Sequence, residues 1–187
     1  MKKKQNAPTA NVASGGFTAG KWRWKVKTLT DPDAKKVDLN HHVPMTLAQI
    51  EALPSPGLSL KDTAKPRGVT PHEFKVIQVS GTVNKLKLEP DGDYHMVVEG
   101  PAGKGMNCEL PKPEFAAGSI GLPEMKAMRA VVESRIGKGD RPGQIIKLPS
   151  PHPQVVVQGV GFWDMQAHGA GEVNGFELHP VLRVEIK

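Results

Sequence analysis

The stretch EFKVIQVSGTVNKLKLEPDGDYHMVVEGPAGKGMNCELP, residues 73–111, decides the fold of this chain. Its first part alternates apolar and polar residues, with Ile77 and Val79 on one face, and this period of two is typical of a half-buried strand. Beyond Gly81 the phase changes, and Leu86 carries the apolar side. A phase change near a mid-strand glycine indicates a bulge or a sharp bend, so the sequence predicts one long, bent strand.

Two turns divide the rest of this stretch. Pro90-Asp91-Gly92 is a turn signal, and a second alternating strand follows over residues 94–98. A glycine-rich turn at 100–105 then leads into a short third strand that ends at Pro111. We expect this meander to be the start of a small barrel.

The remaining elements complete the predicted barrel. A helix is expected over residues 123–136, with a proline in its first turn and one apolar stripe made of Met125, Met128, Val132 and Ile136. Strands follow at 154–164 and 176–186, and Pro180 inside the last one implies either an edge position or a bulge. The order predicts a mainly β protein, a five-stranded OB-fold-like barrel with one helix between strands three and four.

The N-terminal region is predicted to be an extension of the barrel, which spans residues 73–187. Residues 1–20 are small, polar and basic, and we expect a disordered tail. Residues 21–72 are expected to pack on the barrel as a strand, a short helix and a linker. Basic residues alternate with Trp22, Trp24 and Val26 in the strand, and Thr46 with Gln49 forms a capping box for the helix.

Composition restricts the class of protein. The 187 residues favour one domain, and the single cysteine, Cys108, leaves no intrachain disulfide to form. No apolar run approaches the roughly 20 residues of a membrane span, so no membrane partner is expected. The basic start lacks the apolar segment of a signal peptide. The cytoplasm is therefore the default compartment, and the oligomeric state stays open.

Positive charge is concentrated at the N-terminus. The formal net charge is +6, and residues 1–27 contain seven lysines and arginines and no acid, so the rest of the chain is close to neutral. Bases stack on aromatic side chains, and cations neutralise phosphates. The candidate ligand-binding residues are therefore Trp22, Arg23, Trp24, Lys25, Lys27 and Tyr94.

A second group of residues carries possible chemistry. Asp93 and His95 lie on the second strand, Glu109 lies on the third, Asp164 ends the fourth, and Glu177 and His179 lie on the fifth. Strands two and three are neighbours on the ligand-binding side of an OB barrel. If this is an enzyme, its candidate catalytic residues are His95, Asp93, Glu109, His179 and Glu177, and Asp93 with Glu109 are candidate ligands of a divalent cation, Ca²⁺ or Mg²⁺.

Three functions remain open at this point. The first is an OB-fold binding module for single-stranded nucleic acid or another polyanion, assisted by the basic, tryptophan-bearing arm. The second is a metal-assisted hydrolase, a phosphodiesterase or nuclease-like enzyme that uses the Asp, His and Glu set. The third is a structural or protein-interaction domain. No cofactor is firmly implied.

Four stretches resemble a group of small bacterial proteins with which no function is associated. They are VKTLTDPDA at 26–34, DGDYH at 91–95, GVGFWD at 159–164 and ELHPVL at 177–182. The Asp-Gly-Asp at 91–93 also resembles the turn between strands one and two of staphylococcal-nuclease-like OB barrels. That likeness implies a calcium ion near Asp93, although here the third strand ends in Glu-Leu-Pro rather than in the family's following acidic segment.

Overall fold

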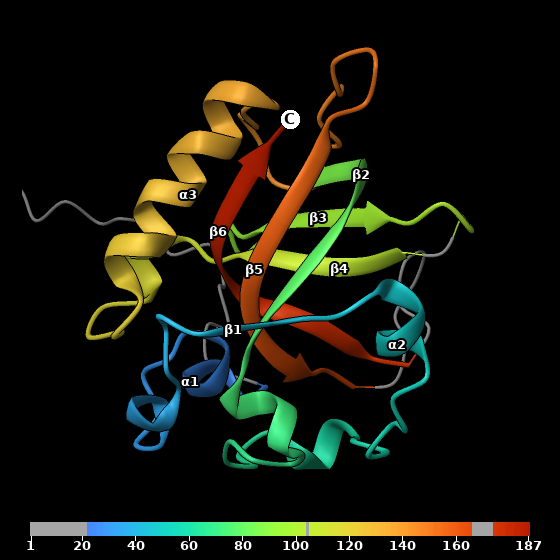
Figure 1. Cartoon of the computed structure of the whole chain (residues 1–187). Coiled ribbons are helices and arrows are strands. Elements are labelled where there is room, and N and C mark those ends of the chain that lie inside the picture. Colours follow the sequence, from blue (N-terminus) through green and yellow to red (C-terminus); the bar gives the residue numbers. More distant parts are fainter. Residues whose placement is uncertain (1–21, 104, 166–173) are drawn as a thin grey trace, which may run out of the picture.

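In the computed structural model, which describes residues 22–103, 105–165 and 174–187, five strands close into a barrel (Figure 1). They are β2 (Val76–Leu88), β3 (Tyr94–Glu99), β4 (Gly105–Leu110), β5 (Gln154–Trp163) and β6 (Phe176–Ile186). The order is β2-β3-β4-β6-β5, and pairing of β2 with β5 closes the ring. Only β4 and β6 run parallel among these pairs. This is the predicted OB-like order.

The long strand β2 joins both sides of the barrel. Its first part pairs with β5 and its second part with β3, and the β3 register shifts between Val83 and Lys85. This shift confirms the irregularity indicated by the change of phase. At Gly81 a Cβ atom would collide with the main-chain oxygen of Glu99, so the close crossing of β2 and β3 requires glycine here.

Strand β6 resolves the question raised by its proline. It lies between β4 and β5, so it is not an edge strand. Its pairing with β5 slips between Gly159 and Gly161, opposite the His179–Pro180 step. The bulge, rather than an edge position, therefore accommodates Pro180.

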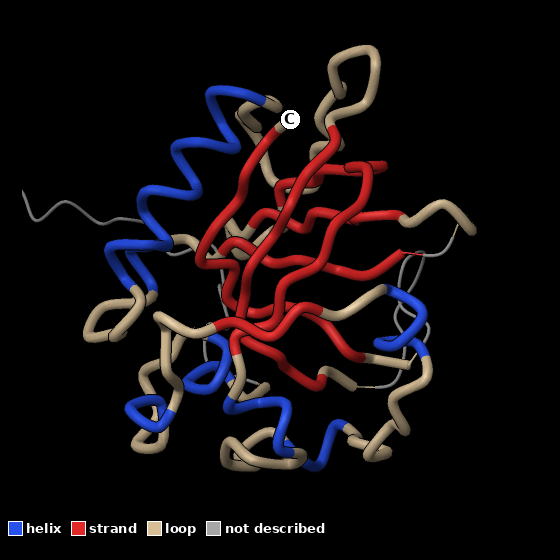
Figure 2. Tube along the Cα trace, in the orientation of Figure 1, coloured by secondary structure: helices blue, strands red, loops and turns tan. Residues whose placement is uncertain are grey.

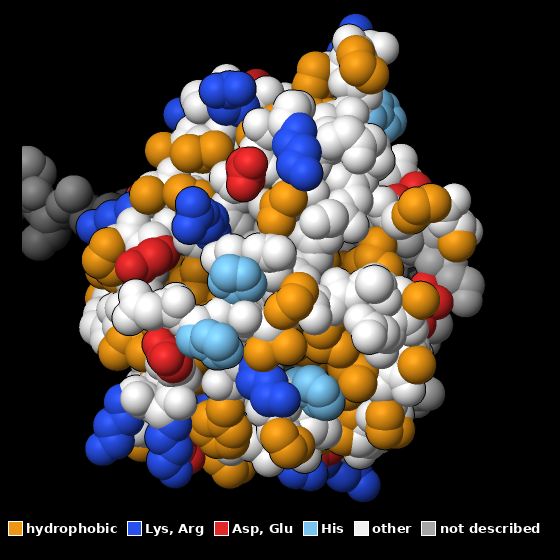
Figure 3. Space-filling model, viewed as in Figure 1, with side chains coloured by type: hydrophobic (Ala, Val, Ile, Leu, Met, Phe, Trp, Pro, Cys, Tyr) orange, Lys and Arg blue, Asp and Glu red, His pale blue; other side chains and the backbone are white. Residues whose placement is uncertain are grey.

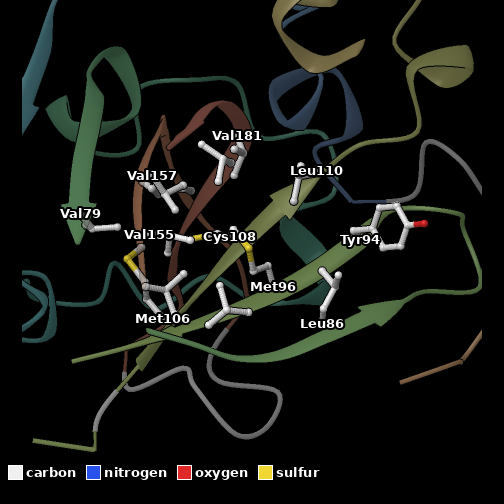
Figure 4. Close-up of a cluster of buried hydrophobic side chains, with 14 of the residues drawn as sticks. Val79, Leu86, Tyr94, Met96, Met106, Cys108, Leu110, Val155, Val157 and Val181 are labelled. Atoms are coloured by element: carbon white, nitrogen blue, oxygen red, sulfur yellow. The ribbon is translucent and has the colours of Figure 1, made fainter. Parts of the chain in front are cut away.

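The helix α3 (Leu122–Arg135) covers one side of the barrel, as predicted (Figures 1 and 2). The side of α3 that faces the barrel carries the buried residues Met125 and Val132, and Ile136, directly after the helix, is buried as well. Met128 is partly buried and packs against the core. Figure 4 shows part of the core that fills the barrel, where side chains from β2, β3, β4, β5 and β6 meet. No helix in the described part of the chain is long and apolar enough to cross a membrane.

The predicted strand at 21–27 is wrong within the residues that the structure describes. Trp24–Lys27 forms a short helix, α1, and Arg23 precedes it in a left-handed conformation with φ 49°. The backbone bonds locally, since Val26 N–H donates to the Arg23 carbonyl at 2.8 Å. Arg23 and Val26 are both buried, and their spacing of three fits a helical turn. The alternation of basic and apolar residues was therefore misleading. The predicted tail, residues 1–20, lies outside the described residues.

Short elements connect α1 to the barrel. They are η1 (Ala34–Lys36), β1 (His42–Pro44), α2 (Leu47–Glu51), η2 (Leu60–Asp62) and η3 (Pro71–Phe74), and η4 (Pro113–Phe115) follows β4. Strand β1 adds to the sheet in parallel with β2. The capping box predicted from Thr46 and Gln49 is present at the start of α2.

Two buried arginines tie the segments of the N-terminal region together, and Arg23 also bonds to the barrel strand β5. Arg23 donates to both carboxylate oxygens of Glu73, at 2.6 and 2.7 Å, and its remaining N–H groups reach the carbonyls of Lys65, Pro66 and Trp163. Arg67 pairs in the same way with Asp31. Residues 22–75 are therefore an integral part of the folded unit.

Candidate functional site

The outer face of β3, β4 and β6 holds most of the polar residues that the sequence singled out. His95 and Glu109 are direct cross-strand partners. Cys108 is in register with Leu178, and both are fully buried in the barrel core. Because successive residues of a strand point to opposite faces, the residues that flank them, Glu109, Glu177 and His179, project outward together.

Two histidine–carboxylate pairs form on this face. His95 Nδ1 lies 2.6 Å from Glu109 Oε1, and these side chains are 21% and 10% exposed. His179 Nδ1 lies 3.3 Å from Glu177 Oε1, and both of these side chains are buried. His179 Nε2 lies 3.9 Å from Asp93 Oδ2, which is too long for a hydrogen bond. The outer pair is therefore partly accessible, and the inner pair is enclosed.

Lys27 extends from α1 to the same place. Its Nζ lies 3.2 Å from Asp164 Oδ2 and 3.7 Å from Glu177 Oε1, and it sits above the ring of Phe162. Burial lowers the pKa of this ammonium, but Glu177, Asp164 and Glu109 more than offset that effect and leave the pKa raised. Lys27 therefore carries a positive charge at neutral pH. We call Lys27, Asp93, His95, Glu109, Asp164, Glu177 and His179 the polar cluster.

Burial shifts the pKa values of Asp93 and His179 toward their uncharged forms. Burial raises the pKa of Asp93 well above its usual value, with a further contribution from Asp91, although the Lys112 N–H donates to its Oδ1 at 2.7 Å and opposes the shift. Burial likewise lowers the pKa of His179 well below its usual value, and the charges of Lys27 and His95 add to this. Within the described residues, His179 Nε2 is buried and has no hydrogen-bond partner.

His179 should give folding stability a pH dependence of defined sign. An unfolded histidine takes up a proton near pH about 6.5, whereas folded His179 stays neutral well below that value. The unfolded chain then binds more protons as pH falls, so stability falls too. We expect the thermal midpoint to drop more between roughly pH 6.5 and 5 in the wild type than in His179→Gln. Melting curves of both proteins across this pH range test the prediction. It would be contradicted if the thermal midpoints of wild type and variant changed with pH in the same way.

His72 and Asp93 also make the folding stability depend on pH, but both residues are present in the wild type and in His179→Gln. The pKa of His72 is lowered by burial, and by Lys75, so it adds to the loss of stability at low pH. The raised pKa of Asp93 has the opposite sign, because its contribution is lost as pH rises through the folded pKa. The difference between wild type and variant is therefore the quantity to measure.

The predicted aromatic and basic strip is not one continuous face. Trp22 donates its indole N–H to the Ser59 carbonyl at 3.2 Å and packs edge-on against Phe162. Arg23 is buried, and all its N–H groups are engaged, as described above. Within this segment Lys25 is exposed, whereas Lys27 belongs to the polar cluster.

The candidate ligand-binding residue Tyr94 and the single cysteine, Cys108, point away from the polar cluster. The Tyr94 ring is buried in the core, and its hydroxyl donates to Glu133 Oε1 at 3.1 Å. The Cys108 thiol is also buried, and burial, followed by the charges of Glu109 and Glu177, raises its pKa well above the usual value. A thiol held in this form is a poor nucleophile.

The donor set does not fit a divalent cation. Within the described residues, no group of three His, Cys, Asp or Glu side chains is placed to hold a metal ion. Asp93 accepts from a main-chain N–H and favours its protonated form, Glu109 is engaged by His95, and the Lys27 cation lies among the carboxylates. The calcium or magnesium site suggested by Asp93 and Glu109 therefore has no support in this arrangement.

The sequence singled out Asp93, His95, Glu109, Asp164, Glu177 and His179 for possible chemistry but left open whether they meet, and it named Lys27 only as a candidate ligand-binding residue. Its role was missed because the predicted strand at 21–27 placed the lysines in solvent. No signal in the sequence connects Lys27 to residues 164 and 177, since the contact depends on how α1 packs. Comparison with protein-family models, with curated proteins and with solved structures gave no match.

Proposed function

We propose that this protein is a hydrolase that activates water at the polar cluster by general acid–base catalysis. The observation that carries the proposal is the 2.6 Å pair between His95 and Glu109 on the outer face of β3 and β4. A histidine titrates close to neutral pH and can both accept and release a proton. A carboxylate that accepts a hydrogen bond from one ring nitrogen fixes the orientation and the tautomer of the imidazole, and so leaves the other nitrogen as the base.

The roles follow from the contacts. With Nδ1–H donated to Glu109, His95 Nε2 is the basic nitrogen and takes a proton from water as the oxygen attacks the electrophilic carbon. Lys27 supplies the positive charge that stabilises the oxyanion as it forms. Burial raises the pKa of Asp93, which favours proton donation, so Asp93 is the candidate donor to the leaving group. Glu177 orients His179, whose Nδ1 lies 3.3 Å from Glu177 Oε1.

The charge of the polar cluster favours a neutral substrate. Glu109, Asp164 and Glu177 bring three carboxylates to one place, against the lysine cation of Lys27 and, when it is protonated, the imidazolium of His95. A phosphodiester or another polyanion would be repelled at this short range. We therefore infer that the substrate is an uncharged carboxylic ester or amide.

The experiment is a screen with chromogenic substrates. Wild type, Glu109→Gln and Glu185→Gln are assayed with p-nitrophenyl acetate, p-nitrophenyl phosphate and bis-p-nitrophenyl phosphate in the presence of a chelator. Glu185 lies at the far end of β6 and is exposed, so it is the matched control. We expect ester hydrolysis by wild type and control, reduced roughly 10²-fold or more in Glu109→Gln. Phosphodiester hydrolysis that needs added metal would contradict the proposal.

A second candidate is binding of single-stranded nucleic acid by the N-terminal region. Its support is the concentration of seven basic residues, without an acid, in residues 1–27; five of them remain when Arg23 and Lys27, which are paired with acids, are set aside. On the face seen in Figure 3, lysines and arginines are scattered among acidic and apolar side chains. Binding of a labelled oligonucleotide at roughly 50 mM salt, with a logarithmic salt slope of about −0.7 per phosphate contacted, would favour this function. Absence of both activities would favour a structural or protein-interaction role.

A further inference from the structure

A concave site lies between α3 and the ends of β3 and β4, outside the polar cluster. It is a polar hollow of about 380 Å³ whose charged lining residues are Lys112, Glu114, Lys126, Arg129, Glu133 and Lys138. Cations outnumber acids in this lining by four to two. We call this feature the basic hollow.

One of the two acids in the lining, Glu133, is already paired with its neighbours. Glu133 accepts from Arg129 Nε at 3.2 Å and from the Tyr94 hydroxyl at 3.1 Å, and Lys138 Nζ lies 4.0 Å from its other oxygen. Glu133 therefore holds the lining in place and has little charge left to offset the remaining cations.

Arg129 is fixed with part of its guanidinium unused. Its side chain lies over the Tyr94 ring, 4.3 Å from the centroid, and its Nη1 donates to the Leu110 carbonyl at 3.3 Å. Tyr94 is itself held, because its hydroxyl accepts from Gly139 N–H at 3.0 Å. Within the described part of the chain, Nη2 of Arg129 makes no hydrogen bond. A planar donor that is held on a ring costs little further ordering when it binds a ligand.

Two lysines complete the positive charge. Among the described residues, neither Lys112 nor Lys126 takes part in an ion pair. Lys112 Nζ lies 5.1 Å from the centroid of the Phe115 ring, and Lys126 is exposed at the rim of the basic hollow. Arginine and lysine together are suited to phosphate, because the first provides directed N–H groups and the second provides mobile point charges.

We propose that the basic hollow binds the phosphate group of a small phosphorylated molecule. Its volume of about 380 Å³ falls near the lower limit of small-ligand pockets, roughly 300–1,000 Å³, and suits a terminal phosphate with a small substituent. This inference does not depend on the proposed hydrolase, since none of the lining side chains belongs to the polar cluster.

Calorimetric titration tests the site with inorganic phosphate, phenyl phosphate and a single-stranded oligonucleotide. We expect saturable binding of both phosphates by the wild type. Lys126→Gln and Arg129→Lys should each raise the dissociation constant for phosphate roughly tenfold, because each variant loses one charge-assisted hydrogen bond. Lys61→Gln removes an exposed lysine elsewhere and should bind as the wild type does. Melting curves without ligand show whether each variant is folded.

Three results would overturn the inference. One is that phosphate at concentrations up to roughly 10 mM shows no saturable binding, because a dissociation constant above that value means almost no affinity. Another is equal weakening in Lys61→Gln and Lys126→Gln, which would indicate a general effect of charge. The third is tighter binding of the oligonucleotide that Lys126→Gln abolishes, which would make the basic hollow part of a nucleic-acid surface.

Discussion

Glu73→Gln should lower the free energy of unfolding by about 3–5 kcal/mol, because it leaves the buried guanidinium of Arg23 without a counter-charge. Both side chains of this ion pair are fully buried. The Glu73 carboxylate also accepts from the main-chain N–H groups of Gly68, Val69 and Trp163. Removal of its charge therefore weakens contacts from three segments at once. Chemical denaturation followed by tryptophan fluorescence measures the change.

The matched control is a carboxylate in an exposed pair. Asp33 Oδ1 lies 2.8 Å from Lys36 Nζ, and these side chains are 37% and 59% exposed; ion pairs in contact with solvent contribute little. Asp33→Asn should leave the unfolding midpoint nearly unchanged. Equal stability of Glu73→Gln and Asp33→Asn would show that the buried pair does not hold the N-terminal region on the barrel.

The second large effect concerns catalysis by His95 and Glu109. His95→Gln and Glu109→Gln should each lower kcat/KM for the ester substrate by roughly 10²–10⁴-fold, the usual contribution of a positioned general base. Because the two residues act as one unit, the double variant should be little slower than either single variant. KM should change much less than kcat, since the pair acts on water rather than on substrate binding.

Structural effects are separated from catalytic ones by two controls. His42→Gln replaces an exposed histidine on β1 and should keep full activity. Melting curves for all variants should lie close to the wild type, because His95 and Glu109 lie at the partly exposed edge of the polar cluster. Two results would argue for a structural role of this pair. The first is a loss of kcat/KM in the double variant equal to the product of the two single losses, and the second is an unfolded protein in both single variants.

The barrel could be predicted because its evidence is local. Alternation at Ile77 and Val79 fixed the faces of the long strand, and the stripe from Met125 to Ile136 fixed the helix between strands three and four. These signals depend on periodicity, which the hydrophobic effect imposes on any half-buried element. The missing N–H group of Pro180 indicated either an edge position or a bulge, and the order of the strands decides for the bulge.

The N-terminal contacts could not be predicted because they depend on long-range packing. Arg23 and Glu73 are fifty residues apart, and nothing in the local pattern distinguishes a buried arginine from an exposed one. The same holds for Lys27, whose partners Asp164 and Glu177 lie at the ends of other strands. Residue types suggested acid–base chemistry on strands two to five, but only the register of β4 with β6 shows which side chains meet.

The most direct test of the proposed function is the ratio of initial rates of ester hydrolysis by wild type and Glu109→Gln, with chelator present and both proteins purified identically. Proton transfer by the His95–Glu109 pair predicts a measurable wild-type rate and a ratio of roughly 10² or more. A ratio near one, or no hydrolysis by the folded wild type above the buffer rate, would contradict it.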